Sequence, residues 1–214
     1  MLLERTSTAE RVAAILRDRI MEGQFPPGSR LSEEAITGGL GISRNTLREA
    51  FRLLAHERLL VHELNRGVFV RVLDTSDVVD LYRVRRVIEC AAVRGVGTLS
   101  ATDAERLTQA VADADTAAAE ERWQDVGTAN LRFHQAIAAL HGSPRIDELM
   151  RQLSAELRLV FHAMHNAKAF YEPYLPRNHA ILDTLLAGDT ATAEKLLDAY
   201  LVDAEIQLSA ASAR

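Results

Sequence analysis

A change of hydrophobic period near residue 60 constrains the fold of this chain more than any other feature of its sequence. Up to that point, apolar residues recur every three to four positions, which is typical of amphipathic helices. The run 68–72, VFVRV, instead alternates, and Asn65, Arg66 and Gly67 separate it from a second β-prone run. Alternation on both sides of a turn predicts a β-hairpin.

Three helices are predicted before this hairpin. The first covers residues 8–22 and is followed by QFPPGSRL, whose prolines and glycine interrupt the helical pattern. Ser32 is placed to cap a second helix, and Ser43 is placed to cap a third one after a turn at Gly41. Three helices followed by a hairpin is the layout of a winged helix-turn-helix, in which the second helix of the pair enters the major groove of DNA.

The third helix has two different faces. Leu47, Phe51 and Leu54 recur at helical spacing and form one apolar stripe. Another face carries three arginines, Arg44, Arg48 and Arg52. Such arginines either keep an exposed helix solvated or contact bases and phosphates, and their spacing alone does not separate these two interpretations.

Charge is unevenly distributed along the chain. The formal net charge is −5, but residues 1–73 carry 11 Arg against 9 Asp or Glu, a net of +2, and the remainder carries a net of −7. This asymmetry suggests an N-terminal module that faces a polyanion and a C-terminal module that does not.

The chain becomes almost entirely helical after a predicted linker at residues 72–76. Capping residues, glycines and prolines divide this part into six segments, 77–98, 102–119, 121–141, 144–168, 176–187 and 190–210. We therefore expect a mainly α protein. A winged helix-turn-helix domain at 1–73, with three helices and a hairpin wing, is joined to an all-α helical bundle at 77–214.

Composition argues against membrane and disulfide-stabilised proteins. With 48% apolar residues the chain can fill a core, and its single cysteine cannot form an internal disulfide. No apolar run approaches the roughly 20 residues of a membrane span. The start, MLLERTSTAERV, lacks the basic-then-apolar pattern of a targeting segment. We expect a cytoplasmic protein that does not enter a membrane.

The segment PPGSRLSEEAITGGLGISRNTLREAFRLLAHERLLVHELNRGVFV resembles the DNA-binding domain of the GntR family. The similarity lies in the Pro-Gly turn, in Ser-Arg followed by the Leu-Arg-Glu-Ala helix, and in the Asn-Arg-Gly wing. The remainder, with DLYRVRRVIECAAV, LRFHQAIAALHGSPRIDEL and AILDTLLAGDTATAEKLLDAYL, is similar to the FCD effector domain of the FadR subfamily. These resemblances imply a homodimeric transcriptional regulator that binds double-stranded operator DNA. They also imply that the helical bundle binds a small metabolite, usually a carboxylate, that changes operator affinity.

By this family pattern, the leading turn of the third helix and the wing contact DNA. The positions implied are Arg44, Asn45, Thr46, Arg48 and Gly67. Arg66, with His62, is a further candidate wing contact, and a solvated hairpin is the alternative for both. Arg44 and Arg48 suit guanine edges or phosphates, and Gly67 lies at the wing tip that reaches the minor groove. One departure concerns the preceding helix, where some relatives carry a DNA-facing arginine and this chain has Glu34.

Many FCD domains bind a divalent metal ion through an Asp or Asn, a His four residues later and two further His. Here Asn130 and His134 match the first pair, but the resemblance places Asn178 and Tyr200 where the other two His would lie. With one imidazole and no carboxylate, this set predicts weak or absent affinity for a zinc-like metal. We expect no firmly bound cofactor, and a divalent metal at Asn130 and His134 is the alternative.

The same residues can instead form a polar pocket floor that hydrogen-bonds the effector directly, and His134 can also be an ordinary buried histidine. Arg85 matches a position at which the family often places a pocket-facing arginine, and a buried arginine needs an anion. That anion is either a carboxylate effector, which we favour, or Glu89 in a structural salt bridge. The predicted effector pocket comprises Arg85, Asn130, His134, Asn178 and Tyr200.

The rival function is a metal-dependent enzyme on the helical domain, with the N-terminal module targeting it to DNA. The sequence offers no nucleophile and base at motif spacing and no glycine-rich phosphate loop. A purely structural DNA-binding protein would not need polar residues grouped in its helical bundle. We therefore expect no catalytic residues and a regulator that senses a small organic acid.

Overall fold

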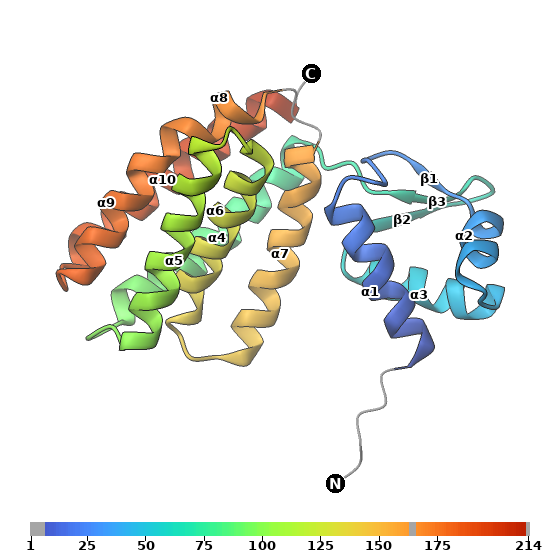
Figure 1. The fold of residues 1–214 in the computed structure, drawn as a ribbon, viewed down its shortest axis with the longest axis horizontal. Coiled ribbons are helices and arrows are strands. Elements are labelled where there is room, and N and C mark those ends of the chain that lie inside the picture. Colours follow the sequence, from blue (N-terminus) through green and yellow to red (C-terminus); the bar gives the residue numbers. More distant parts are fainter. Residues whose placement is uncertain (1–6, 163–165, 213–214) are drawn as a thin grey trace, which may run out of the picture. The chain divides into compact units, whose positions relative to one another are not determined.

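The computed structural model describes residues 7–162 and 166–212 of the chain. Figure 1 shows a mainly helical protein with one small sheet in its N-terminal part, and the predicted fold class is confirmed. The chain forms two compact units, and the boundary between them lies between Leu73 and Asp74. A short stretch near residue 160 is grouped with the first unit. Each unit is described by itself.

The first unit is a winged helix-turn-helix. Its elements are α1 (Thr8–Met21), β1 (Arg30–Leu31), α2 (Glu33–Leu40), α3 (Arg44–His56), β2 (Leu60–Glu63) and β3 (Gly67–Val70). The predicted hairpin consists of β2 and β3, which pair antiparallel with Val61 opposite Phe69. The sequence did not predict β1, which pairs with the other edge of β3. A strand of two residues is too short to show an alternating pattern.

Local capping sets where α2 and α3 begin. Ser32 Oγ accepts a hydrogen bond from the backbone N–H of Ala35 at 3.2 Å, and Ser43 Oγ accepts one from that of Thr46 at 3.1 Å. Between the helices Gly41 has a φ of 63°, in the left-handed region that glycine adopts most easily. Both predicted caps and the predicted glycine turn are therefore present.

The core of this unit lies between α1, α3 and the sheet. The whole predicted apolar stripe of α3 is buried, and so are Val68 and Val70 of β3. Val72 lies beyond the strand, and 63% of its surface is exposed. The expectation that the alternating pattern extends to Val72 was wrong, because pairing between β2 and β3 ends at Val70.

The second unit is an all-helical bundle. It comprises α4 (Thr75–Gly95), α5 (Ala101–Ala119), α6 (Trp123–Ala139), α7 (Pro144–His162), α8 (Ala167–Tyr171), the 3-10 turn η1 (Glu172–Tyr174), α9 (Leu175–Leu186) and α10 (Thr190–Ser212). Helix α4 packs along α10, and α5 packs along α6, so that the first and last helices of the unit lie side by side (Figure 1). No helix in the described ranges is long and apolar enough to span a membrane.

The region after α7 differs from the sequence prediction. Residues 163–165, inside the predicted helix 144–168, lie outside the described residues. The segment YEPYLP, predicted as a break, is helical. Its prolines, Pro173 and Pro176, occupy the first turns of η1 and α9, where a backbone N–H has no helical partner to lose.

Candidate functional site

The leading turn of α3 is held by its own cap. Ser43 Oγ accepts from the Thr46 backbone N–H and lies 2.8 Å from the Thr46 hydroxyl. Arg44 and Asn45, directly after the cap, are exposed. The first three predicted DNA contacts therefore sit on one well-defined helical turn, and a helix N-terminus also favours an anion such as phosphate.

Arg48 lies one turn further along α3 and is paired with α2. Its Nε donates to Glu33 Oε1 and its Nη2 donates to Glu33 Oε2, each at 3.3 Å. The Arg48 side chain nevertheless remains 58% exposed. Arg52, a turn further again, is exposed as well, so the arginine face of α3 points away from the core.

The tip of the wing depends on backbone angles that few residues adopt. Asn65 has a φ of 62° and Gly67 a φ of 112°, both in the region that glycine tolerates best. Arg66 lies between them, is exposed and forms an ion pair with Glu63. Its guanidinium carbon lies 5.4 Å from the centre of the Phe69 ring. The wing therefore presents a positive side chain next to a glycine whose backbone can be approached closely.

A surface depression is lined by residues of the wing and of α3. It has a volume of about 420 Å³ and is lined by Arg30, Leu31, Ser32, Glu33, Glu34, Arg44, Gly67 and Val68. Arg30 belongs to this surface and was missed from the sequence, because β1, which positions it, was not predicted. A Cβ placed on Gly67 would lie 3.1 Å from Arg30 Nε, so Arg30 packs directly on the wing turn.

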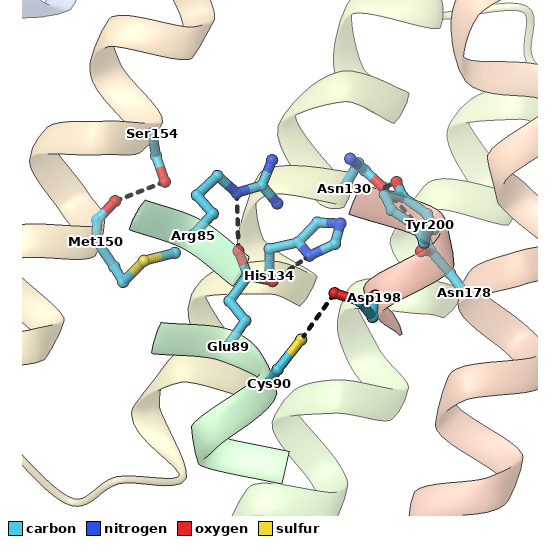
Figure 2. A network of polar contacts seen from close by, with 10 residues as sticks. All are labelled: Arg85, Glu89, Cys90, Asn130, His134, Met150, Ser154, Asn178, Asp198 and Tyr200. Atoms are coloured by element: carbon cyan, nitrogen blue, oxygen red, sulfur yellow. Dashed lines mark hydrogen bonds and ion pairs between the residues drawn. The ribbon is translucent and has the colours of Figure 1, made fainter. Parts of the chain in front are cut away.

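A buried polar cluster lies in the helical unit (Figure 2). It brings together the five residues of the predicted effector pocket: Arg85 from α4, Asn130 and His134 from α6, Asn178 from α9 and Tyr200 from α10. None of them is more than 6% exposed. The family resemblance therefore identified side chains that are neighbours in space, and their role in effector binding stays a prediction.

Glu89 on α4 is the centre of the charged half of the cluster. Its Oε1 accepts from Arg85 Nε at 2.7 Å, and its Oε2 lies 2.6 Å from His134 Nδ1. Burial alone would raise the pKa of Glu89, but the Arg85 charge and His134 hold it below its ordinary value. Glu89 is therefore ionised at neutral pH, and a carboxylate only accepts hydrogen bonds, so His134 Nδ1 carries a proton. The sequence had offered Glu89 only as an alternative partner for Arg85.

His134 is neutral in this setting. Burial lowers its pKa and outweighs the Glu89 carboxylate, which raises it, while the charge on Arg85 lowers it further. With the proton on Nδ1, the other ring nitrogen, Nε2, is a hydrogen-bond acceptor. The ring packs against Tyr200, with 4.8 Å between the two ring centres.

Asn130 organises the uncharged half of the cluster. Its Oδ1 accepts from Asn178 Nδ2 and from the Tyr200 hydroxyl, both at 2.8 Å. Burial raises the pKa of Tyr200, so this hydroxyl remains a donor. One amide oxygen on α6 thereby fixes side chains from α9 and α10.

Three buried polar atoms of the cluster lack a hydrogen-bond partner within the described part of the chain. They are Arg85 Nη2, His134 Nε2 and Asn178 Oδ1. An unpaired buried donor or acceptor costs roughly 1–3 kcal/mol, and such atoms are rare in folded proteins. Three of them in one cluster indicate a polar partner that the described residues do not supply, such as ordered water or a bound small molecule.

As arranged here, the cluster offers few free ligands to a divalent metal ion. The Asn130 oxygen that would coordinate a metal already accepts two hydrogen bonds, and both oxygens of Glu89 are engaged by Arg85 and His134. Among residues 7–162 and 166–212, no group of three or more His, Cys, Asp or Glu is arranged to hold a metal.

Comparison with known proteins assigns each of the two units to a known family. Residues 8–70 match the family described as bacterial regulatory proteins, gntR family, and residues 80–203 match the FCD domain. The chain belongs to the GntR family. Its helical unit is an FCD domain, and the protein is a DNA-binding transcriptional regulator and not an enzyme.

Individual proteins extend this likeness. A solved structure from Rhodococcus sp. RHA1, described as a transcriptional regulator GntR, is 53% identical with a TM-score of 0.88, over 95% of this chain and 98% of that one. Escherichia coli McbR/YncC, at 22% identity, has the same fold with a TM-score of 0.80 over 97% and 99% of the two chains. The Nta operon transcriptional regulator of Aminobacter aminovorans is 41% identical over 81 residues, and the chain spans only 38% of that relative.

Proposed function

We propose that this GntR-family regulator senses a small organic acid bound at the cluster of Arg85, Asn130, His134, Asn178 and Tyr200, and that binding changes its affinity for operator DNA. The observation that supports the proposal is the set of three unpartnered buried atoms on Arg85, His134 and Asn178. A cluster that served folding alone would gain from apolar replacements of similar shape, because these remove the cost of burying polar groups.

The hydrogen-bonding pattern suggests the chemistry of the acid. Arg85 Nη2 is a donor and suits a carboxylate oxygen. His134 Nε2 and Asn178 Oδ1 are acceptors and need a donor, which an ionised carboxylate lacks. An acid that also carries hydroxyl groups would satisfy all three atoms. We propose that it binds without a metal ion, since the donor set suits hydrogen bonds and not coordination.

Identification of the ligand tests this proposal. The protein is purified without added ligand, small molecules released on denaturation are measured by mass spectrometry, and calorimetry compares each hydroxy acid with its deoxy and amide counterparts. We expect loss of either the hydroxyl groups or the carboxylate to weaken binding by at least roughly tenfold. An acid that binds equally well without its hydroxyl groups, or metal retained in stoichiometric amount, would contradict the proposal.

A matched pair of histidine variants links the ligand to the cluster. His134→Gln should weaken acid binding. His141→Gln should leave it unchanged, because His141 Nε2 lies 3.0 Å from the Ile88 carbonyl oxygen and is not among the cluster residues. Equal effects of the two variants would place the acid elsewhere.

We also propose that the protein acts as a cytoplasmic homodimer that contacts a two-half-site operator through α3 and the wing. The proposed contacts are Arg44, Asn45, Thr46, Arg48, Arg66 and Gly67. Support comes from the exposure of the α3 arginines and from the depression that Arg44 shares with Gly67. A dimer follows from the symmetry that paired half-sites require.

Operator binding and sedimentation test this second proposal. Arg44→Ala should weaken binding of a selected duplex by roughly 1–3 kcal/mol. Arg83→Ala, which removes an exposed arginine of the helical unit, serves as the charge-matched control and should have little effect. Sedimentation should give twice the mass of one chain, and a single-chain mass on operator DNA would exclude the dimer.

A further inference from the structure

Glu33 holds the side chain of Arg48 from one side. It is the first residue of α2, directly after the cap Ser32. Its two carboxylate oxygens accept from Arg48 Nε and Nη2, each at 3.3 Å. In this side-on arrangement two parallel hydrogen bonds join planar groups. The plane and direction of the Arg48 guanidinium are therefore set by a residue on the other helix of the helix-turn-helix.

The pairing leaves one edge of Arg48 available. A guanidinium carries five N–H donors, and the pair with Glu33 uses one on Nε and one on Nη2. The remaining donors, on Nη1 and Nη2, form the end of the fork that can bind O6 and N7 of a guanine. Since the Arg48 side chain is 58% exposed while paired, this edge is accessible to DNA.

The pair has little to contribute to folding. Glu33 is 35% exposed and Arg48 is 58% exposed, and an ion pair in such a position adds little stability. Beside it lies a depression of about 410 Å³ whose lining includes Phe51, Val61 and His62. Without Glu33, the long Arg48 side chain has room to adopt other rotamers there.

We propose that Glu33 is a specificity-determining positioning residue of this regulator. It orients Arg48 for a bidentate contact with a guanine, and its own negative charge opposes binding modes in which the same arginine contacts phosphate. Glu33 makes no base contact itself. The inference rests on the proposed function in one respect, namely that Arg48 reads a base.

Two glutamate variants form a matched test. Glu33→Gln removes the charge that pairs with Arg48, and Glu22→Gln removes the same charge from an exposed residue at the end of α1, outside the proposed DNA-contact surface. The full chain and each variant select duplexes from a random-sequence library. Their affinities are then measured for the selected duplex and for an unselected duplex of equal length at one salt concentration, because salt alters both values.

We expect Glu33→Gln to lower the ratio of selected to unselected affinity about tenfold, the size of one base-reading contact. Its selected sequences should lose the preference for guanine at one position of each half-site, while affinity for the unselected duplex stays equal or rises. Glu22→Gln should keep the ratio. In the Arg48→Ala background, Glu33→Gln should have no further effect on the ratio.

Two outcomes would overturn the inference in distinguishable ways. If Glu33→Gln and Glu22→Gln change the ratio equally, Glu33 acts only through its charge and does not position Arg48. If Arg48→Ala selects the same sequences as the wild type with the same ratio, then Arg48 does not read a base. In that case the proposed DNA contact at Arg48 fails together with the role of Glu33.

Discussion

At the scale of single residues, Glu89 has the largest predicted influence on stability. It is fully buried, and its two oxygens bond side chains from two different helices. Its partner Arg85 is also buried. Removing one member of such a pair leaves the other charge without compensation in a medium of low polarity.

Glu89→Gln should therefore lower the free energy of unfolding by about 3–5 kcal/mol. Glu194→Gln is the control, because it breaks the pair with Arg94, whose side chain is 67% exposed. This control should change stability by less than about 1 kcal/mol. Urea denaturation of both variants measures the difference, and equal stabilities would show that the buried pair is not what holds the cluster.

Neutral His134 should make stability depend on pH. Its pKa is lowered in the folded state, so the unfolded chain binds more protons once the pH falls below the unfolded value of about 6.5. The contribution of neutral His134 is complete above that value and is lost as pH falls through the folded pKa. His134→Gln should have a flatter stability profile than the wild type between about pH 7 and 5. Urea titrations across this range test it, and parallel profiles would contradict a lowered pKa.

The sequence could predict one half of this cluster and not the other. Arg85 and Glu89 stand four residues apart on one helix, a spacing at which side chains meet, so their pairing was visible as an alternative. The bond from Glu89 to His134 joins α4 to α6 and depends on how these helices pack. No spacing along the chain encodes that contact.

At the scale of helices and strands, long periodic segments were predictable and short ones were not. Apolar stripes and capping residues in the sequence predicted α2, α3 and the main helices of the bundle. Helix α8 has five residues, fewer than two helical turns, and strand β1 has two residues, a single repeat of a strand. Both are fixed by partners distant in sequence, and β1 positions Arg30, which explains why that residue was missed.

Close packing of α6 against α8 predicts a strong effect of Gly127→Ala. A Cβ at Gly127 would lie 2.4 Å from the Tyr171 hydroxyl and 2.5 Å from its Cζ, and this ring is only 2% exposed. The variant should lose about 1–3 kcal/mol of stability from overpacking, even though alanine is the better helix former. Gly95→Ala, with no atom within 4 Å of the added Cβ, is the control and should melt at the wild-type temperature or slightly above it. Equal melting temperatures would refute the packing argument.

At the scale of the whole molecule, the charge and the hydrophobic period of the sequence predicted two different units. The N-terminal 73 residues combine a net positive charge with a helix-to-strand change, and the rest is acidic and helical. What the regulator does with an effector is a property of both units together. A ligand shifts operator affinity only by the factor by which it prefers one state of the protein over another.

Reciprocity between the two sites is a prediction at this scale. If saturating acid lowers operator affinity by some factor, operator DNA must lower acid affinity by the same factor. Calorimetry of the acid with free and operator-bound protein measures one side, and operator titrations with and without acid measure the other. His134→Gln should bind operator as the wild type does and lose the response to acid. A response that survives in this variant would place the sensing site outside the cluster.

With His134 neutral, Arg85 and Glu89 cancel each other, so the cluster is electroneutral before any ligand arrives. A carboxylate that enters such a buried space is costly unless a positive charge accompanies it. The positive group that such a carboxylate can reach is Arg85, whose Nη2 has no hydrogen-bond partner within the described part of the chain. A singly charged acid bound there would therefore leave the cluster with one net negative charge, so the regulator should discriminate against acids that carry more than one charge.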